Sequence, residues 1–275
     1  MINWRSYKGK TVLVTGASTG IGKAMAEYLA AQKAIPILVA RSKDKLDALA
    51  EKIQSNGGEA HVFAEDLSVP GSAEKLYNAV TEAGLSVDLL VNNAGYGRWG
   101  AFMEHEPADY TRMIQLNITT LTELCHLFLG DMLSSKSGGI INVASIASFG
   151  PVPYGNVYSS TKAYVLTFSE ALSFEYKDKG VHVMALCPGA TESEFMKVAT
   201  EKSEEARKNA DKISGSMIFQ SSEEVAKECF DAFLRGEIYH ITGMSNRVAM
   251  TATKFLPRSL ALSVVGSLFK KVVKG

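Results

Sequence analysis

The chain has 275 residues, of which 46% are hydrophobic and 21% are charged, a composition typical of a soluble globular protein. Lysine plus arginine and aspartate plus glutamate balance at 29 each, so net charge gives no reason to expect a nucleic-acid partner. The N-terminal residues 1–16 pass into a strand-like run without the charged and apolar regions of a secretory signal, so we expect a cytoplasmic protein.

The cysteines and histidines do not have the spacing of a metal site. The three cysteines lie far apart in the sequence, and the five histidines form no HxxxH or comparable cluster. We predict no metal, and reduced core positions for Cys125, Cys187 and Cys229.

Short apolar runs alternate with segments of helical period along the chain. Strands are expected at residues 11–15, 35–40, 60–64, 87–93, 139–145, 181–189 and 237–243. Helices are expected at about 20–32, 43–55, 107–133, 157–178 and 222–235. The alternation predicts an α/β fold: a single-domain, Rossmann-type, doubly wound parallel sheet of about seven strands with helices on both faces. The strands are uniformly apolar, as in sheets that are covered on both faces.

Two segments fall outside this alternation. Residues 190–221 combine a charged stretch with an apolar cluster, and we expect a substrate lid, the alternative being a mobile surface loop. Residues 244–275 form a C-terminal extension in which Pro257 can open a helix with an apolar stripe and a basic end. That stripe favours docking on the protein itself or on a partner subunit over contact with a membrane surface.

The first strand is followed by a glycine turn, "TGASTGIG", with Gly16, Gly20 and Gly22. Glycines allow a tight turn and close approach of the backbone to a ligand, and a helix N-terminus favours a phosphate. At the first strand–helix turn of an alternating chain, this pattern predicts a dinucleotide site.

The residues after the second and third strands bear on which dinucleotide binds. The second strand ends in Ala40-Arg41, where an NAD site would normally carry Asp or Glu, whereas arginine suits the 2′-phosphate of NADP(H). Asp66 could accept from the adenine amino group, although an Asx turn explains it almost as well.

Together with these features, "DL" at 66–67, "NNAG" at 92–95, Asn117, Ser145, "YSSTK" at 158–162 and "PG" at 188–189 resemble the short-chain dehydrogenase/reductase family. The elements occur in the family's order and spacing over about residues 9–243. The resemblance implies an oxidoreductase with a catalytic tetrad of Asn117, Ser145, Tyr158 and Lys162.

The chemistry of the tetrad follows from its residue types. Residues four apart share one helix face, and Tyr158 is the one tyrosine with a lysine four positions later. An ammonium near the phenol should lower its pKa from about 10, so that Tyr158 can donate a proton to a carbonyl oxygen. Ser145 would hold that oxygen. Asn117 by itself indicates a surface residue, but the resemblance implies a local helix distortion whose carbonyl holds a water that relays protons to Lys162.

The resemblance also implies the residues that contact NADP(H), with Lys162 on the nicotinamide ribose. They are Gly16, Ser18, Thr19, Gly20, Ile21, Gly22, Arg41, Asp66, Leu67, Asn93, Ala94, Gly95, Tyr158, Lys162, Pro188, Gly189 and Thr191. Thr191 is shifted relative to the family's usual sequence motif, "PGxVxT".

The remaining expectations concern substrate and assembly. Apolar candidates for the pocket favour a lipophilic ketone or acyl chain, such as a 3-oxoacyl thioester or a steroid-like ketone. They are Tyr96, Trp99, Phe102, Val152, Tyr154, Phe195, Met196, Met217, Ile218 and Phe219. We expect a reversible NADPH-dependent ketone reductase; the alternative is a non-catalytic NADP-binding regulatory or scaffold protein. The resemblance also implies a homodimer or tetramer built on the 107–133 and 157–178 helices.

Overall fold

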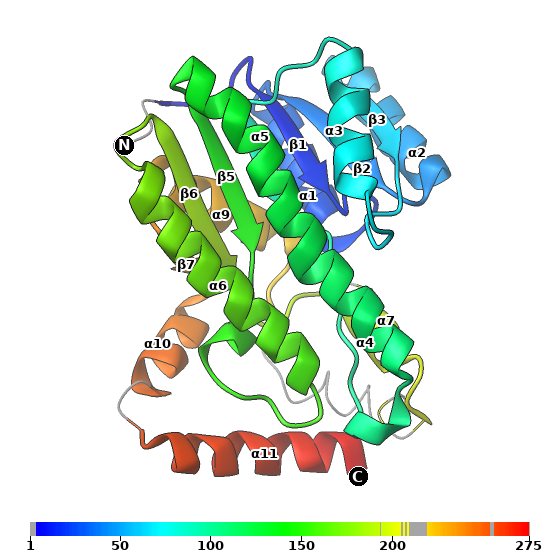
Figure 1. Ribbon diagram of the computed structural model, residues 1–275, viewed down its shortest axis with the longest axis vertical. Coiled ribbons are helices and arrows are strands. Elements are labelled where there is room, and N and C mark those ends of the chain that lie inside the picture. Colours follow the sequence, from blue (N-terminus) through cyan, green and yellow to red (C-terminus); the bar gives the residue numbers. More distant parts are fainter. Residues whose placement is uncertain are drawn as a thin grey trace.

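The computed structural model describes residues 4–192, 194–204, 206, 208, 219–253 and 256–274, without the side chains of 196, 261, 268 and 271–274. Seven parallel strands form one sheet in the order β3-β2-β1-β4-β5-β6-β7 (Figure 1). The strands are β1 Thr11–Thr15, β2 Ile35–Ala40, β3 His61–Ala64, β4 Leu89–Asn92, β5 Gly138–Val143, β6 Val181–Cys187 and β7 Tyr239–Ile241. The predicted doubly wound parallel sheet is therefore confirmed.

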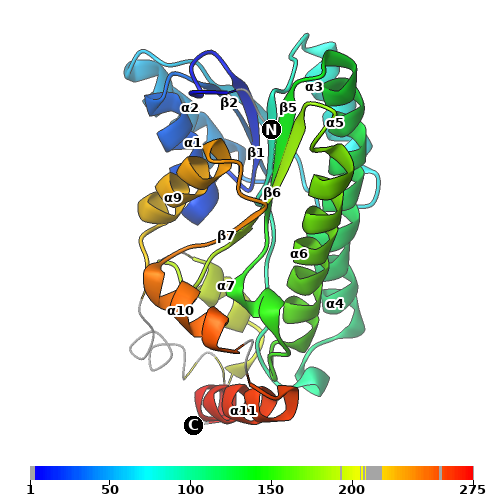
Figure 2. The same ribbon diagram turned by 90° about the vertical axis from the view of Figure 1, so that its left-hand side faces the viewer.

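Helices cover both faces of the sheet (Figure 2). One face carries α1 Gly20–Ala31, α2 Lys43–Ser55 and α9 Ser222–Leu234. The other carries α3 Ser72–Glu82, α5 Leu121–Ser135 and α6 Asn156–Tyr176. The two faces hold two separate apolar cores. Alternate residues of each strand enter opposite cores, as Val12 and Leu13 of β1 do, which explains why the strands are apolar throughout.

Two helical regions differ from the sequence prediction. Helix α3 was not predicted, because only Ala73, Leu76 and Val80 mark its buried side. The expected 107–133 helix is divided into α4 Pro107–Ile114, a π-helical turn over Gln115–Thr120 and α5. The π turn is a local helix distortion of the kind that was expected at Asn117.

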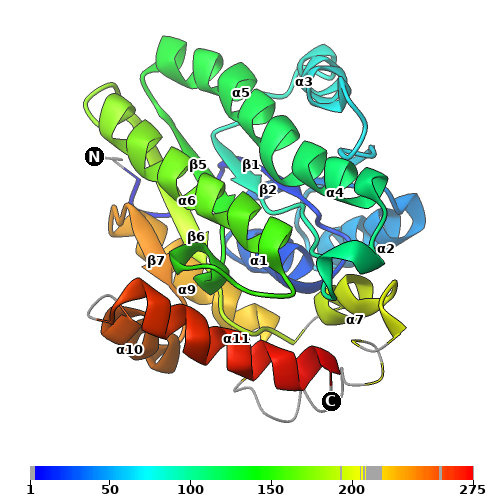
Figure 3. The same ribbon diagram turned by 60° about the horizontal axis from the view of Figure 1, so that its bottom comes forward.

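The C-terminal extension consists of α10 Met244–Thr253 and α11 Arg258–Lys274, with Pro257 immediately before α11. Helix α11 crosses the molecule beyond the carboxyl ends of the strands (Figures 1 and 3). No helix among the described residues is long and apolar enough to cross a membrane. The cysteines Cys125, Cys187 and Cys229 are free and buried, as predicted.

Candidate active site

The predicted site residues converge where β1, β4, β5 and β6 end. Gly16 follows β1, Asn93 follows β4, Ser145 follows β5 and Pro188 follows β6. These strands are neighbours in the sheet, so their carboxyl ends meet at one edge, where open α/β sheets bind ligands.

The glycine turn leaves no room for side chains. Gly16 has a φ of +67°, and a Cβ there would lie 2.8 Å from Asn93 Nδ2. A Cβ on Gly22 would lie 2.3 Å from the carbonyl oxygen of Gly16. No side chain caps the N-terminus of α1, and its first turn carries no acidic residue. Ser18 and Thr19 lie in the turn and Ile21 in the first helical turn, so main-chain N–H groups and the positive helix end remain available to a phosphate.

Thr15 ties the ends of β1 and β4 together, a role that the sequence analysis missed. Its Oγ1 accepts hydrogen bonds from the main-chain N–H groups of Asn93 and Ala94, each at 2.9 Å. Asn93 Nδ2 in turn donates to the Thr15 carbonyl at 2.9 Å. The strand-ending threonine of "TVLVT" was the available signal.

Asn117 is buried, not a surface residue as the residues alone indicated. Its Nδ2 donates to the Tyr96 carbonyl and to Thr161 Oγ1, both at 3.0 Å. Its Oδ1 accepts from the Tyr96 N–H at 3.2 Å. A Cβ on Gly95 would lie 3.0 Å from Asn117 Oδ1 and 3.4 Å from Lys162 Nζ. Because glycine has no side chain, the loop after β4 can lie close to Asn117 and Lys162. Asn117 therefore connects the loop after β4 to helix α6.

Ser145 and its neighbour Ser148 have separate roles. The Ser145 hydroxyl accepts from the Ala147 N–H at 3.1 Å and acts on the Tyr158 phenol, whose pKa it lowers. The Ser148 hydroxyl accepts from the Ser145 N–H at 3.2 Å and donates to the Lys162 carbonyl at 2.8 Å. The spacing-based choice of Ser145 over Ser148 matches this geometry, because Ser148 is engaged in fixing the loop to α6.

Tyr158 and Lys162 lie on one buried side of α6. Burial lowers the pKa of Lys162 to about 8. The Lys162 ammonium donates to the Val143 carbonyl at 2.7 Å and lies 5.9 Å from the centre of the Tyr158 ring. The four-residue spacing thus brings the two groups to one site.

The expected lowering of the Tyr158 pKa does not occur in this arrangement. Burial raises the pKa of Tyr158 to about 12, and the hydrogen bond with Ser145 opposes this rise only in part. The cause is desolvation of the phenolate by burial, while the Lys162 ammonium is bonded to the Val143 carbonyl.

The residues expected near the adenosine end lie after β2 and β3. Asp66 Oδ1 accepts from the Ser68 N–H at 3.0 Å and from the Ser68 hydroxyl, which is the Asx turn considered above. Burial raises the pKa of Asp66, but these hydrogen bonds and nearby Arg41 and Arg112 outweigh it and bring the pKa below its ordinary value. Arg41 is exposed beside this turn, and the Leu67 carbonyl accepts from Thr120 at 2.9 Å.

At the nicotinamide end, Pro188 and Gly189 follow β6. The Pro188 carbonyl accepts from the Ile146 N–H at 2.9 Å, and the Thr191 hydroxyl donates to the Gly189 carbonyl at 3.1 Å. A Cβ on Gly189 would lie 2.2 Å from Asn246 Nδ2, which itself donates to the Thr242 carbonyl. Asn246 of α10 is a further residue that the sequence analysis missed.

Apolar side chains surround Tyr158 on the substrate side. Trp99 and Phe195 have ring centres 6.1 Å and 5.4 Å from that of Tyr158, and Val152 belongs to the same cluster. Phe269 of α11 stacks on Trp99 with ring centres 4.8 Å apart and planes at 10°. The wall around the tyrosine is therefore aromatic and includes the C-terminal helix.

The other predicted pocket positions differ in their surroundings. Tyr96 packs against the cluster, whereas Phe102 is 54% exposed and stacks on Tyr110. Tyr154 has a φ of +65°, a strained conformation for a non-glycine residue, four positions before Tyr158. Phe219 is half-buried. Met217, Ile218 and the Met196 side chain lie outside the described residues.

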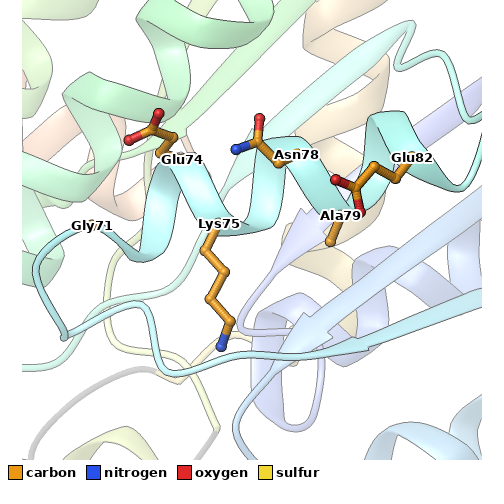
Figure 4. A pocket seen from close by; sticks show the side chains of 6 residues that line it. All are labelled: Gly71, Glu74, Lys75, Asn78, Ala79 and Glu82. Carbon is orange, nitrogen blue, oxygen red and sulfur yellow. The ribbon is translucent and has the colours of Figure 1, made fainter.

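A surface hollow on α3 is separate from this site. The residue before α3 and five residues of the helix line it, and none of them is a predicted site residue: Gly71, Glu74, Lys75, Asn78, Ala79 and Glu82 (Figure 4). Lys75 forms an ion pair with Glu65 at 2.6 Å, so its side chain is engaged in a surface contact. Within the described part of the chain, no group of three His, Cys, Asp or Glu residues could hold a metal ion.

The sequence of the chain is similar to those of known proteins. A family model for the short chain dehydrogenases matches residues 10–204. The 3-oxoacyl-[acyl-carrier-protein] reductase FabG of Aquifex aeolicus is 31% identical over 252 residues, which are 86% of this chain and 97% of the relative. A very-long-chain 3-oxoacyl-CoA reductase of Danio rerio is 36% identical over 196 residues, which are 69% of this chain but 60% of the relative. A short chain dehydrogenase of Pseudocercospora fijiensis is matched over 62% of its length. The chain thus spans less than two thirds of the length of these last two relatives.

Solved structures show the same likeness over more of the chain. A short-chain dehydrogenase from Sphingobium yanoikuyae in complex with NADPH superposes with a TM-score of 0.77 at 29% identity, covering 89% of this chain and 93% of that one. A 7β-hydroxysteroid dehydrogenase superposes with a TM-score of 0.82 at 26% identity, covering 94% and 98%. The chain belongs to the short-chain dehydrogenase family of oxidoreductases, whose members typically use NAD(P)(H).

Proposed function

We propose that the protein is an NADPH-dependent reductase that converts a ketone reversibly to a secondary alcohol. The observation that carries the proposal is the buried Tyr158 phenol, whose pKa the Ser145 hydroxyl lowers and which lies on one side of α6 with Lys162. These three groups lie at the sheet edge where the glycine turn offers a phosphate site. A non-catalytic nucleotide-binding protein would need no such arrangement.

The roles of the residues follow from their chemistry. The ketone oxygen accepts hydrogen bonds from the hydroxyls of Tyr158 and Ser145, which polarise the carbonyl. The hydride for the carbonyl carbon would come from NADPH when it is bound. Tyr158 donates its proton to the oxygen, and the Lys162 charge stabilises the phenolate that remains. Asn117, tied to Tyr96 and Thr161, holds the loop after β4 against α6.

The residues present fit a dinucleotide. Gly16 and Gly22 form a turn in which any side chain would clash, and the uncapped start of α1 suits a pyrophosphate. Arg41 supports NADPH over NADH, because a guanidinium at this strand end pairs with a 2′-phosphate and a carboxylate would repel it. The complex of the Sphingobium yanoikuyae relative with NADPH is consistent with this choice.

The substrate is proposed to be lipophilic or to carry an acyl chain. Trp99, Phe195 and Val152 present an apolar wall beside Tyr158, which favours hydrocarbon over a sugar. The names of the 3-oxoacyl reductases and of the hydroxysteroid dehydrogenase among the similar proteins support 3-oxoacyl thioesters and steroid-like ketones as the first compounds to test.

A substrate panel tests the proposal. NADPH consumption is followed with a 3-oxoacyl thioester, a steroid ketone, a small aromatic ketone and a ketose as the polar control. We expect turnover of at least one apolar ketone and little turnover of the ketose. Tight NADPH binding without turnover of any ketone would contradict the reductase and favour a regulatory protein.

We also propose a homodimer or homotetramer that uses the face formed by α5 and α6. These helices lie side by side on the outside of the sheet (Figure 1), and Tyr164 and Phe174 on α6 are 38% and 72% exposed. Light scattering with Phe174→Glu as the interface variant tests the assembly; a monomeric mass for the unaltered protein would contradict it.

A further inference from the structure

The catalytic tyrosine is closed off by two helices that are held in different ways. Tyr158 is 7% exposed and lies among Trp99, Phe195 and the cluster to which α11 contributes Val265 and Phe269. A bulky ketone therefore reaches the phenol only after one of these elements moves. The contacts of the two helices indicate which one moves.

Helix α7, Phe195–Thr200, is fastened to the loop after β4 by polar contacts. The Trp99 N–H donates to the Ala199 carbonyl at 2.9 Å, and Arg98 Nη1 donates to the Val198 carbonyl at 2.7 Å. The Arg98 guanidinium also pairs with Glu201 at 3.0 Å. Displacing α7 would leave a buried guanidinium and main-chain groups without partners, which is costly.

Helix α11 is held differently. Among the α11 residues whose side chains the structure describes, no side-chain hydrogen bond or ion pair joins the helix to the rest of the chain. The Leu260 N–H donates to the carbonyl of Pro257, immediately before the helix, at 3.0 Å. The other contacts are apolar: Phe269 on Trp99, and Val265 in the same cluster. Its outer side leaves Leu260 and Val264 about half exposed. Such a helix can move away without breaking a polar contact of its described side chains.

A second, independent observation concerns the Trp99 indole. It is 7% exposed, and a Cβ on Gly155 would lie 2.6 Å from its six-membered ring, so the ring is enclosed. Its Nε1 donor is nevertheless buried and has no hydrogen-bond partner in the described part of the chain. An unpaired buried donor destabilises this closed packing, and moving α11 would expose the indole to water or to a polar group of the substrate.

We propose that α11 is the displaceable cover of the active site, and that the Phe269–Trp99 stack is the contact that a bulky substrate must break to reach Tyr158. Phe269 thereby determines specificity for substrate size, while α7 remains a fixed wall. The inference rests on the proposed ketone reductase for its substrate, but the position of the cover can be measured without turnover.

Tryptophan fluorescence provides that measurement, because the chain has two tryptophans, Trp4 and Trp99. Trp4 packs on Tyr7 and Phe233, away from this cluster, so Trp4→Phe leaves Trp99 as the sole reporter. In that background, Phe269→Ala should raise the acrylamide quenching constant of Trp99 by about twofold or more, because the open population grows. Phe269→Leu should give a smaller rise. Val264→Ala, on the outer side of α11, should leave the quenching constant of Trp99 unchanged.

Kinetics test the consequence for substrate size. When the closed form is destabilised, the apparent affinity rises with the open fraction, so Phe269→Ala should lower the KM for a steroid-sized ketone several-fold with little change in kcat. The KM for a small ketone should change less. An unchanged quenching constant, or a KM for the bulky ketone that stays the same or rises, would overturn the cover. If quenching rises as expected but the unaltered protein reduces no ketone, the proposed reductase activity is wrong, whereas the proposal that α11 is a displaceable cover is supported.

Discussion

The Lys162 ammonium donates a hydrogen bond to the main-chain carbonyl of Val143 at 2.7 Å, and so is anchored to the end of β5. This contact fixes the lysine between Tyr158 and the sheet edge. The cation still faces the Tyr158 ring, 5.9 Å from its centre, so it favours the phenolate formed after proton donation. Burial, which disfavours the charged form, lowers the pKa of this lysine to about 8.

The pH dependence of reduction should reflect Lys162. Below pH 8 the buried lysine is charged and stabilises the phenolate; above it the lysine loses its proton and that stabilisation disappears. We expect kcat/KM for ketone reduction to fall as pH rises through about 8. Burial raises the pKa of Tyr158 to about 12, so the phenol stays protonated below that pH and does not change the slope of the profile there. Melting temperatures across the same range control for unfolding, and a profile that stays flat to pH 10 would contradict this assignment.

Thr161 should matter because it completes the bonds of Asn117. Thr161→Val removes the acceptor of Asn117 Nδ2 in a buried site, which should cost about 1–3 kcal/mol of unfolding free energy. Thr161→Ser keeps the hydroxyl and should recover most of that loss. Chemical denaturation of the two variants measures the difference. Equal stability of the valine and serine variants would show that the hydrogen bond has no net effect.

Gly22→Ala should abolish nucleotide binding. The added Cβ would lie 2.3 Å from the Gly16 carbonyl oxygen, so the turn must shift and its N–H groups lose their alignment. Gly130→Ala is the matched control, since nothing lies within 4 Å of a Cβ there. Titration calorimetry with NADPH compares the two; unimpaired binding by Gly22→Ala would exclude this turn as the phosphate site.

Arg41 should set the cofactor preference. Arg41→Ala removes the cation beside the Asp66 turn, and we expect the Kd for NADPH to rise by tenfold or more, about 1.4 kcal/mol, with little change for NADH. Arg235→Ala, which removes an exposed arginine after α9, serves as the control. Parallel weakening of both cofactors would mean that Arg41 does not recognise the 2′-phosphate.

Much of the fold and the site could be predicted because the signals are local. Uniformly apolar strands fixed the sheet, and the four-residue spacing of Tyr158 and Lys162 placed both on one helix face. What was missed depends on contacts between distant residues. Thr15 bonds Asn93 and Ala94 across the sheet, and Asn246 meets Gly189 from a helix beyond the last strand.

The pKa of Tyr158 was predicted in the wrong direction for a related reason. Sequence spacing shows that a cation is near, but it does not show how deeply the phenol is buried or that Val143 holds the ammonium. The burial of Asn117 was likewise invisible to helix propensity, because the π turn that carries it is stabilised by Tyr96 and Thr161.

The most direct test of the account is NADPH oxidation by the Tyr158→Phe variant with the best ketone from the panel. Loss of the proton donor should lower kcat by about 10²–10⁴-fold while NADPH binding stays unchanged. Tyr164→Phe, which removes an exposed phenol two turns away on α6, should behave like the unaltered protein. Undiminished turnover by Tyr158→Phe would contradict the assignment of Tyr158 as the proton donor and with it the proposed mechanism.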